Sequence, residues 1–180
     1  MQFPWILVIF VSPTFTQMKK LLFALPLLFL LTACPIGIDY APGQVGTEAV
    51  DTRFEGTWVL DPSTPDHEVL KVTFKKQNKF AYAVTVEERG ELYALETDEL
   101  FMYQTTIDGL KVMYLKPSNE DDYYLYQFEF DGNQLVVGDI SLLDGGVDAV
   151  TSTETLRQQI AASKSKEEFL AIQKYVFNKK

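Results

Sequence analysis

From Phe54 to Ile140 the sequence alternates between apolar and polar residues with a period of two, and short clusters of turn-forming residues interrupt the alternation. Successive side chains along a β-strand point to opposite faces, so this pattern predicts strands that each bury one face. The short breaks between the runs predict antiparallel neighbours joined in a meander. We expect strands at residues 56–60, 69–76, 80–86, 91–96, 100–107, 110–116, 122–130 and 134–140.

Eight up-and-down strands with one apolar face close into a barrel or fold into a tight sandwich, because closure removes the exposed edges of the sheet. After residue 146 the period changes, and two capping-box spacings predict short helices, at Thr151/Glu154 and at Ser165/Glu168. The sequence leaves open whether residues 175–177 form a ninth strand or end the second helix. The predicted fold is mostly β: an antiparallel up-and-down eight-stranded barrel, or a tight sandwich, followed by two short C-terminal helices.

Predicted turns also indicate which side chains share a face. A two-residue turn at 108–109, a three-residue loop at 97–99 and a five-residue loop at 117–121 place four tyrosines in one cross-strand row: Tyr93, Tyr103, Tyr114 and Tyr124. We expect this row to face the barrel interior, where tyrosine hydroxyls need hydrogen-bond partners. The hydroxyls could bond one another, buried water or the polar end of a ligand. The first two alternatives describe an ordinary aromatic core.

The first 33 residues contain two lysines and no acidic residue. Met18-Lys19-Lys20 precedes a short apolar run, which ends in small residues. This order is typical of an export signal, and the run is too short for a comfortable membrane span. Because residues 1–17 precede the basic pair, we expect translation to begin at Met18. The alternative is an uncleaved membrane anchor built from residues 6–15 and 21–31, which would place charged lysines within the bilayer.

The end of that run, Leu31-Thr32-Ala33-Cys34, resembles the bacterial lipobox. The resemblance implies that residues 1–33 are a signal peptide and that Cys34 becomes the diacylated first residue, anchored in a membrane. Pro35 follows the cysteine, where an Asp would favour retention at the inner membrane. The resemblance therefore implies an outer-membrane protein facing the periplasm, or one at the cell surface. Residues 34–52 lack an apolar period and are expected to form a flexible tether, about 60 Å long when extended, before a domain at 53–180.

Charge narrows the possible partners. Without the first 33 residues the chain keeps 14 basic and 25 acidic residues among 147, a net charge of −11. This balance argues against a nucleic-acid partner, which would require clustered Lys and Arg. The single cysteine excludes an intrachain disulfide and a multi-cysteine zinc site. The expected partners are the membrane, through the lipid anchor, and either a small hydrophobic ligand or another envelope protein.

Gly56-Thr57-Trp58 opens the first predicted strand and resembles the Gly-x-Trp signature of lipocalin and wider calycin barrels. The resemblance implies that Trp58 closes one end of the barrel and packs against an arginine from a late strand. In this chain the next arginine after Arg89 is Arg157, in the first predicted helix. A lipocalin-like bacterial lipoprotein is the description that the sequence supports best.

No constellation in the sequence indicates an enzyme, a metal site or a cofactor. His67 lies in a polar loop near Ser63 without a nucleophile elbow. The acidic residues at 120–122 and 131 lack EF-hand order, and the glutamates at 87–88 and the acids at 96–99 fall at predicted turns, where charge is expected. We expect a protein without catalytic activity, cofactor or metal.

Two functions remain in competition. The first is an envelope lipoprotein that binds a small apolar or amphipathic molecule within its barrel, with candidate lining residues Trp58, Tyr93, Tyr103, Tyr114 and Tyr124. The second is a structural or protein-interaction module of the envelope with a filled core. A hydrolase is a third and weaker alternative. An enclosed apolar cavity of a few hundred cubic ångströms would favour the first function, and a filled interior the second.

Overall fold

A computed structural model of the chain describes residues 37–64, 69–88, 91–93 and 99–180, with residues 69, 70, 88 and 91–93 described by their backbone alone. The contacts between residues divide the chain into units at 1–35 and 36–180, and every described residue belongs to the second unit.

Nine strands are described: β1 Gly56–Leu60, β2 Val69–Lys76, β3 Tyr82–Glu88, β4 Glu91–Tyr93, β5 Leu100–Ile107, β6 Leu110–Pro117, β7 Tyr124–Asp131, β8 Gln134–Asp139 and β9 Lys174–Lys179. The helical elements are η2 Thr52–Phe54, η3 Val147–Ala149, α2 Thr153–Ser163 and α3 Glu167–Leu170. The described chain therefore begins its regular structure with one 3₁₀ turn, continues as a meander and returns to a strand at its end.

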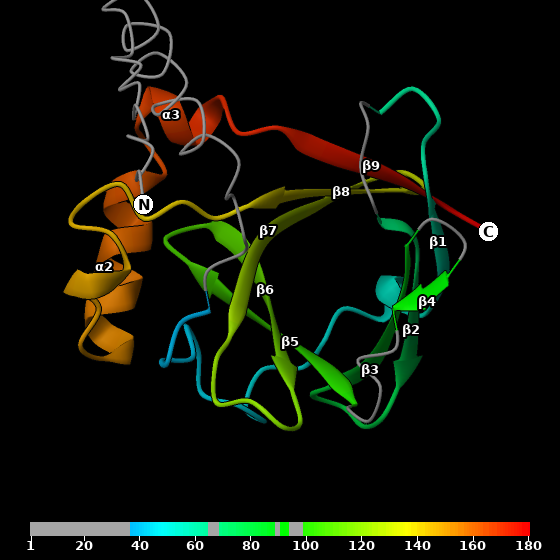
Figure 1. Cartoon of the computed structure of the whole chain (residues 1–180), viewed down its shortest axis with the longest axis horizontal. Coiled ribbons are helices and arrows are strands. Elements are labelled where there is room, and N and C mark those ends of the chain that lie inside the picture. The colour runs from blue at the N-terminus through cyan, green and yellow to red at the C-terminus, as the bar shows by residue number, and fades with distance from the viewer. Residues whose placement is uncertain (1–36, 65–68, 89–90, 94–98) are drawn as a thin grey trace, which may run out of the picture. The chain divides into compact units, whose positions relative to one another are not determined.

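The strands form one antiparallel sheet in the order β2-β1-β9-β8-β7-β6-β5-β3-β4, and a further pairing of β2 with β3 closes it. Eight strands make up the closed ring, which Figure 1 shows with α2 outside it. The predicted eight-stranded antiparallel barrel is confirmed. Its eighth strand is β9, which pairs with both β8 and β1, while the helices lie between β8 and β9. The segment left open at residues 175–177 is thus a strand.

Strand β4 lies outside the ring. It pairs with the last residues of β3, and β5 pairs with the first residues of the same strand. Val86 faces Tyr93 and Tyr82 faces Met102 across these two pairings. The predicted pairing of Tyr93 with Tyr103 is therefore wrong, because β3, and not β4, is the ring neighbour of β5.

The interior of the barrel is a cluster of buried side chains to which all eight ring strands contribute: Val50, Phe54, Trp58, Phe74, Tyr82, Val84, Met102, Met113, Phe128, Leu135, Val137 and Phe177. Alternate residues along each strand supply this cluster, as the period-two pattern predicts. Burial of these large apolar side chains is the main favourable contribution to folding.

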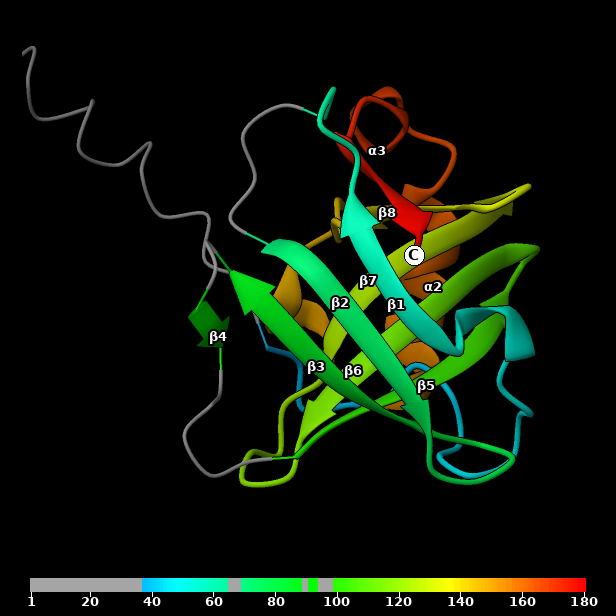
Figure 2. The ribbon, with the colours of Figure 1, turned by 90° about the vertical axis from the view of Figure 1, so that its right-hand side faces the viewer.

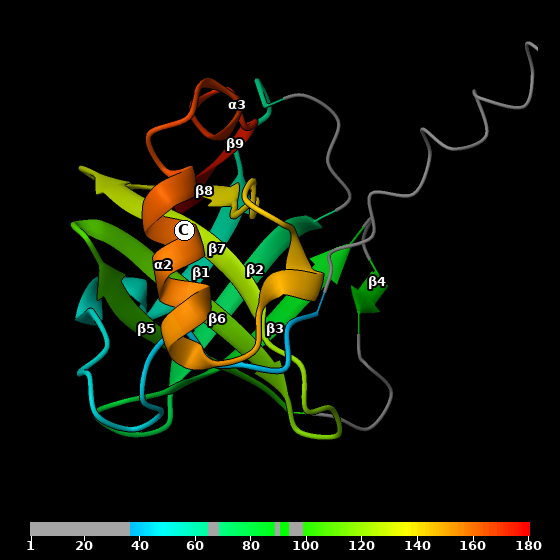
Figure 3. The same ribbon diagram turned by 90° about the vertical axis from the view of Figure 1, so that its left-hand side faces the viewer.

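A second core lies between the outer face of the barrel and α2, which Figure 3 shows lying across β5, β6 and β7. Its buried members are Ile38, Ile107, Val112, Tyr114, Leu125, Leu156 and Ile160. The sequence predicts that the strand face with Tyr103 and Tyr114 is the barrel interior, and this prediction is wrong. That face is apolar because α2 and residues 38–41 cover it from outside.

Two turns decide how the tyrosines are arranged. The two-residue turn at Asp108-Gly109 has positive φ at both residues, as predicted, and Tyr103 lies opposite Tyr114. Across the next turn, however, Tyr114 pairs with Leu125 and Tyr124 pairs with Leu115. The predicted Tyr114–Tyr124 pair is wrong by one residue, and a slip of one residue moves every side chain to the opposite face.

Helix α2 begins one residue later than the predicted cap at Thr151 implies. Ser152 is the N-cap and forms a capping box with Thr155, which replaces the predicted partner Glu154. Hydroxyl oxygens at both positions satisfy the free backbone N–H groups of the first turn. Leu156 and Ile160, predicted as its apolar stripe, are fully buried in the second core.

Residues 37–51, which we call the strap, run from Ile38 in the outer core to Val50 in the barrel cluster. The sequence predicts a flexible tether here, and the structure instead packs these residues at both ends. Ile38 exchanges two backbone hydrogen bonds with Tyr123, of 3.1 and 2.9 Å, and the backbone N–H of Val50 donates to the carbonyl of Lys79. Between these points Arg157 of α2 donates to the carbonyl of Pro42 at 2.7 Å. The strap is held by isolated apolar residues, and isolated residues produce no hydrophobic periodicity from which the sequence could predict their burial.

Candidate functional site

The two ends of the barrel differ. In Figure 2 the 3₁₀ helix η2 and the β7–β8 turn lie at the right-hand end, and the end of β3 lies at the left. Phe54 of η2 enters the right-hand end and is fully buried. Its ring lies 4.9 Å from those of Phe128 and Phe130 and 5.1 Å from that of Phe74, measured between centroids. This half of the interior is filled by aromatic rings, and we call it the closed end.

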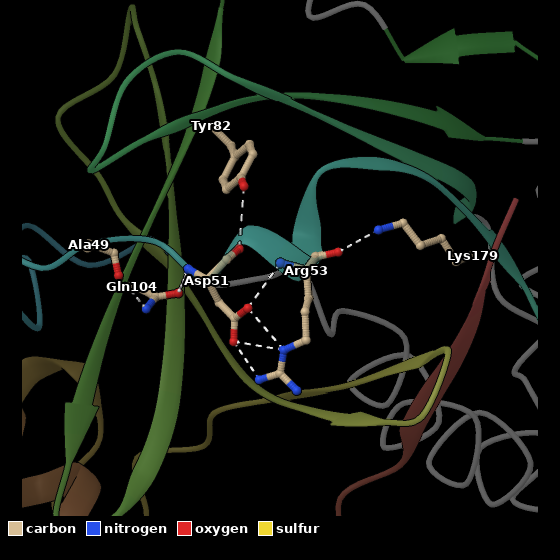
Figure 4. Close-up of polar contacts among 6 residues, drawn as sticks. All are labelled: Ala49, Asp51, Arg53, Tyr82, Gln104 and Lys179. Carbon is tan, nitrogen blue, oxygen red and sulfur yellow. Dashed lines mark hydrogen bonds and ion pairs between the residues drawn. The ribbon is translucent and has the colours of Figure 1, made fainter.

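Polar contacts hold η2 in place at the closed end (Figure 4). Gln104 accepts a hydrogen bond from the backbone N–H of Asp51 at 2.9 Å and donates to the carbonyl of Ala49 at 2.8 Å. Tyr82 donates to the carbonyl of Asp51 at 3.4 Å. The carboxylate of Asp51 accepts from the Arg53 guanidinium, and this hydrogen bond holds the pKa of Asp51 below its usual value. The closed end is therefore fixed by side chains from β3, β5 and the strap.

Trp58 lies within the barrel with 1% of its surface exposed, and its indole N–H donates to the carbonyl of Phe54 at 2.7 Å. The ammonium of Lys179 lies over its ring, 5.2 Å from the ring centroid. That ammonium also donates to the carbonyl of Arg53 at 2.9 Å. Lys179 belongs to β9, so the last strand of the ring supplies this cation.

The opposite end of the barrel is lined by side chains that point inward but remain only half-buried. They are Leu60, Val72, Val86, Leu100, Leu115, Tyr126 and Tyr175, and we call this set the cup. Leu60 and Val86 lie near the ends of their strands, and Leu100 lies at the start of β5. Because the described side chains at this end are partly exposed, we call it the open end.

One side of the cup is polar. Tyr126 pairs with Asp139 across β7 and β8, and burial raises the pKa of Tyr126 to about 12, with the charges of Asp139 and Tyr124 adding to the effect. Burial and Asp139 also raise the pKa of Tyr175 above its usual value. Both hydroxyls are protonated at neutral pH, as tyrosine hydroxyls ordinarily are. An apolar wall facing two tyrosines and a carboxylate suits an amphipathic molecule.

The tyrosines predicted from the sequence fall in different places. Tyr103 and Tyr114 stack outside the barrel with ring centroids 5.5 Å apart, and burial raises the pKa of both. Tyr124 donates to Glu120 at 2.9 Å at the rim of the open end. Tyr93 is described by its backbone alone, in β4. Of the four predicted lining residues whose side chains are described, only Trp58 belongs to the buried barrel cluster.

A shallow groove of about 320 Å³ lies on the outer surface near the closed end. Its walls come from the strap, the β2–β3 turn and β5: Val45, Gly46, Gln77, Asn78, Phe80, Ala81, Phe101 and Tyr103. Tyr103 is therefore next to a depression, although this lies outside the barrel and not within it.

The acidic clusters considered in the sequence are dispersed. Glu120, Asp121 and Asp122 lie at one end of β7, and Asp131 lies at the other. Within the described residues, no three His, Cys, Asp or Glu side chains gather to form a possible metal site. Glu87 forms an ion pair with Lys71, whereas His67, residues 94–98 and Cys34 lie outside the described part of the chain.

The sequence does not reveal the cup, nor Phe54, which acts as a plug in the closed end. The cup residues are alternate apolar positions, but the slip at the β6–β7 turn assigned β5 and β6 to the wrong face and so hid Leu100 and Leu115. Phe54 precedes the first strand and belongs to no periodic run. The signal that could have located Lys179 is the alternation Tyr175, Phe177, Lys179, which aligns the lysine with two inward-facing aromatics.

Two further findings complete the description. Of the helices in the described ranges, none has both the length and the apolar character needed to cross a bilayer. Comparison of the chain with protein-family models and with the curated proteins found no match.

Proposed function

We propose that this protein is a cell-envelope lipoprotein, anchored through Cys34, whose barrel binds the apolar part of a small amphipathic molecule in the cup. The observation that carries the proposal is the contrast between the two ends of one barrel. Most inward-facing side chains are buried at the closed end, where Phe130 alone of the four phenylalanines is partly exposed, whereas those of the cup are half-exposed at the open end.

The chemistry of the cup favours a ligand with an apolar body and a polar head. Aliphatic side chains from β1, β2, β3, β5 and β6 form most of its wall, while Tyr126 and Tyr175 stand on the side of Asp139. Small-molecule sites are generally apolar with a few placed polar groups. The closed end limits the depth of the site, because aromatic rings occupy the interior there.

The ligand site is tested by one pair of neighbouring variants on β1. Leu60→Gln places an amide in the cup, while Val59→Gln changes an outward-facing residue that is already 36% exposed. Titration with the fluorescent apolar probe N-phenyl-1-naphthylamine should give saturable binding to the wild type and to Val59→Gln. Leu60→Gln should bind about tenfold more weakly, because a buried amide without a partner costs roughly 1–3 kcal/mol. Equal affinity of the two variants for the probe would show that the probe does not bind in the cup.

The anchor is tested separately by replacing Cys34 with Ser, which cannot be acylated through a thioether. The wild type should remain with the membrane fraction, and the variant should appear in the soluble fraction after export. Retention of the Cys34→Ser variant in membranes would contradict the lipid anchor, whatever the cup binds.

The filled closed end favours a second candidate, a protein-interaction module of the envelope. Phe54, Phe74, Phe128 and Phe130 pack there as an ordinary aromatic core. Absence of saturable probe binding by the wild type would support this module over the ligand-binding protein.

A further inference from the structure

We infer that the barrel stands directly on the membrane that holds its lipid anchor, with the open end facing the lipid surface. The inference rests on the lipid anchor at Cys34 in the proposed function. It comes from the distance along the chain between Cys34 and the first residue fixed to the barrel.

That residue is Ile38, which is 5% exposed and exchanges two backbone hydrogen bonds with Tyr123. Four residue steps separate it from Cys34, and an extended chain covers about 14 Å in that number of steps. A flexible tether through residue 52 would reach about 60 Å and leave the domain free to turn. Because the strap is packed, this freedom is absent and the spacer is short.

The attachment point lies at the open end. Tyr123 immediately precedes β7, whose first residues pair with the last residues of β6 beside the cup. Strand β7 runs from there to the closed end, and its eight residues span about 26 Å along the strand. With the usual tilt of barrel strands, the two ends are about 20 Å apart along the barrel axis.

These two lengths exclude the reversed orientation. If the closed end faced the lipid, Ile38 would be at least about 20 Å from the surface, which is more than the spacer of about 14 Å can cover. The rim around the attachment point therefore faces the membrane. The cup opens on the same side, so this orientation also fixes the direction from which an amphipathic ligand enters.

Surface charge is not what brings the rim to the membrane. Asp39, Glu120, Asp121 and Asp122 lie around the attachment point, and burial together with Asp39 raises the pKa of Asp122. Carboxylates near the rim oppose adhesion to anionic lipid, while Lys116 is engaged by Asp121 and by the ring of Tyr123. The short spacer must hold the rim close, and a longer spacer should release it.

The test uses the full lipidated chain, in which an introduced cysteine is the single free thiol once Cys34 is acylated. Asn119 and Asn133 are exposed residues in the turns at the two ends of β7, so Asn119→Cys and Asn133→Cys form a matched pair. Each variant is labelled with bimane and reconstituted into vesicles of phosphatidylethanolamine and phosphatidylglycerol that carry nitroxide head groups. Flotation of the vesicles first measures whether the protein is anchored.

We expect the Asn119 label to lose most of its fluorescence to the nitroxide lipids and the Asn133 label to lose little. Inserting twenty Gly and Ser residues after Pro35 should abolish this difference. Equal quenching of the two labels, or stronger quenching of the Asn133 label, in floating vesicles would overturn the inference and leave the anchor standing. A difference that survives the insertion would show adhesion through the surface and would also overturn it. Failure to float would overturn the anchor and the inference together.

Discussion

At the scale of single residues, Phe54 has the largest expected effect on stability. It is fully buried and touches the rings of Phe74, Tyr82, Phe128 and Phe130. Replacing it with Ala leaves a cavity at the closed end, and such losses cost about 3–5 kcal/mol. We expect Phe54→Ala to lower the free energy of unfolding by that amount, measured by urea denaturation and circular dichroism.

Phe80 supplies the matched control, because it is a phenylalanine in a turn at the same end and is only half-buried. Phe80→Ala should cost less than about 1.5 kcal/mol, since less apolar surface is lost. If Phe54→Ala cannot be expressed as folded protein, Phe54→Leu keeps most of the volume and should show the same order of effect at reduced size. Equal losses for Phe54→Ala and Phe80→Ala would mean that Phe54 does not act as a plug.

At the scale of elements, strand positions could be predicted well because each strand has its own alternation. The bounds of β1, β2 and β5 agree with the prediction to the residue. Pairing was harder, because it depends on loop length. At the β6–β7 turn, the error of one residue placed Tyr114 on the same face as Tyr124, whereas Tyr114 lies on the opposite, outer face.

Two elements lie beyond what periodicity can reveal. The strap carries isolated anchors, Ile38 and Val50, whose burial depends on distant partners such as Tyr123 and Lys79. Strand β4 breaks the meander because it pairs with β3 beside β5, an arrangement that local sequence cannot distinguish from a ring strand. The ring neighbour of β5 could therefore not be predicted, and without it the residues of the cup could not be assembled.

At the scale of the whole domain, both cores contain buried tyrosines whose ionisation at high pH should lower the free energy of unfolding. Burial raises the pKa of Tyr82, Tyr126 and Tyr175 among the barrel side chains, and of Tyr103 and Tyr114 in the outer core. For Tyr126 the value rises from 10.0 to about 12. A raised pKa means that the folded state holds a proton which the unfolded state releases, so stability from this group is complete below pH 10 and is lost as the pH rises toward 12.

We therefore expect a cooperative alkaline unfolding transition in which tyrosinate absorbance rises together with the loss of β-sheet circular dichroism. Tyr126→Phe removes one ionisable group from the cup side of the barrel and should move the transition to higher pH, provided that its hydroxyl contributes little else to stability. Tyr40→Phe, in the strap, changes a tyrosine that is only partly buried against the outer core and should shift the transition less than Tyr126→Phe does. A full rise in tyrosinate absorbance near pH 10, with the circular dichroism unchanged, would mean that these hydroxyls are open to solvent in the folded protein and that neither core protects them.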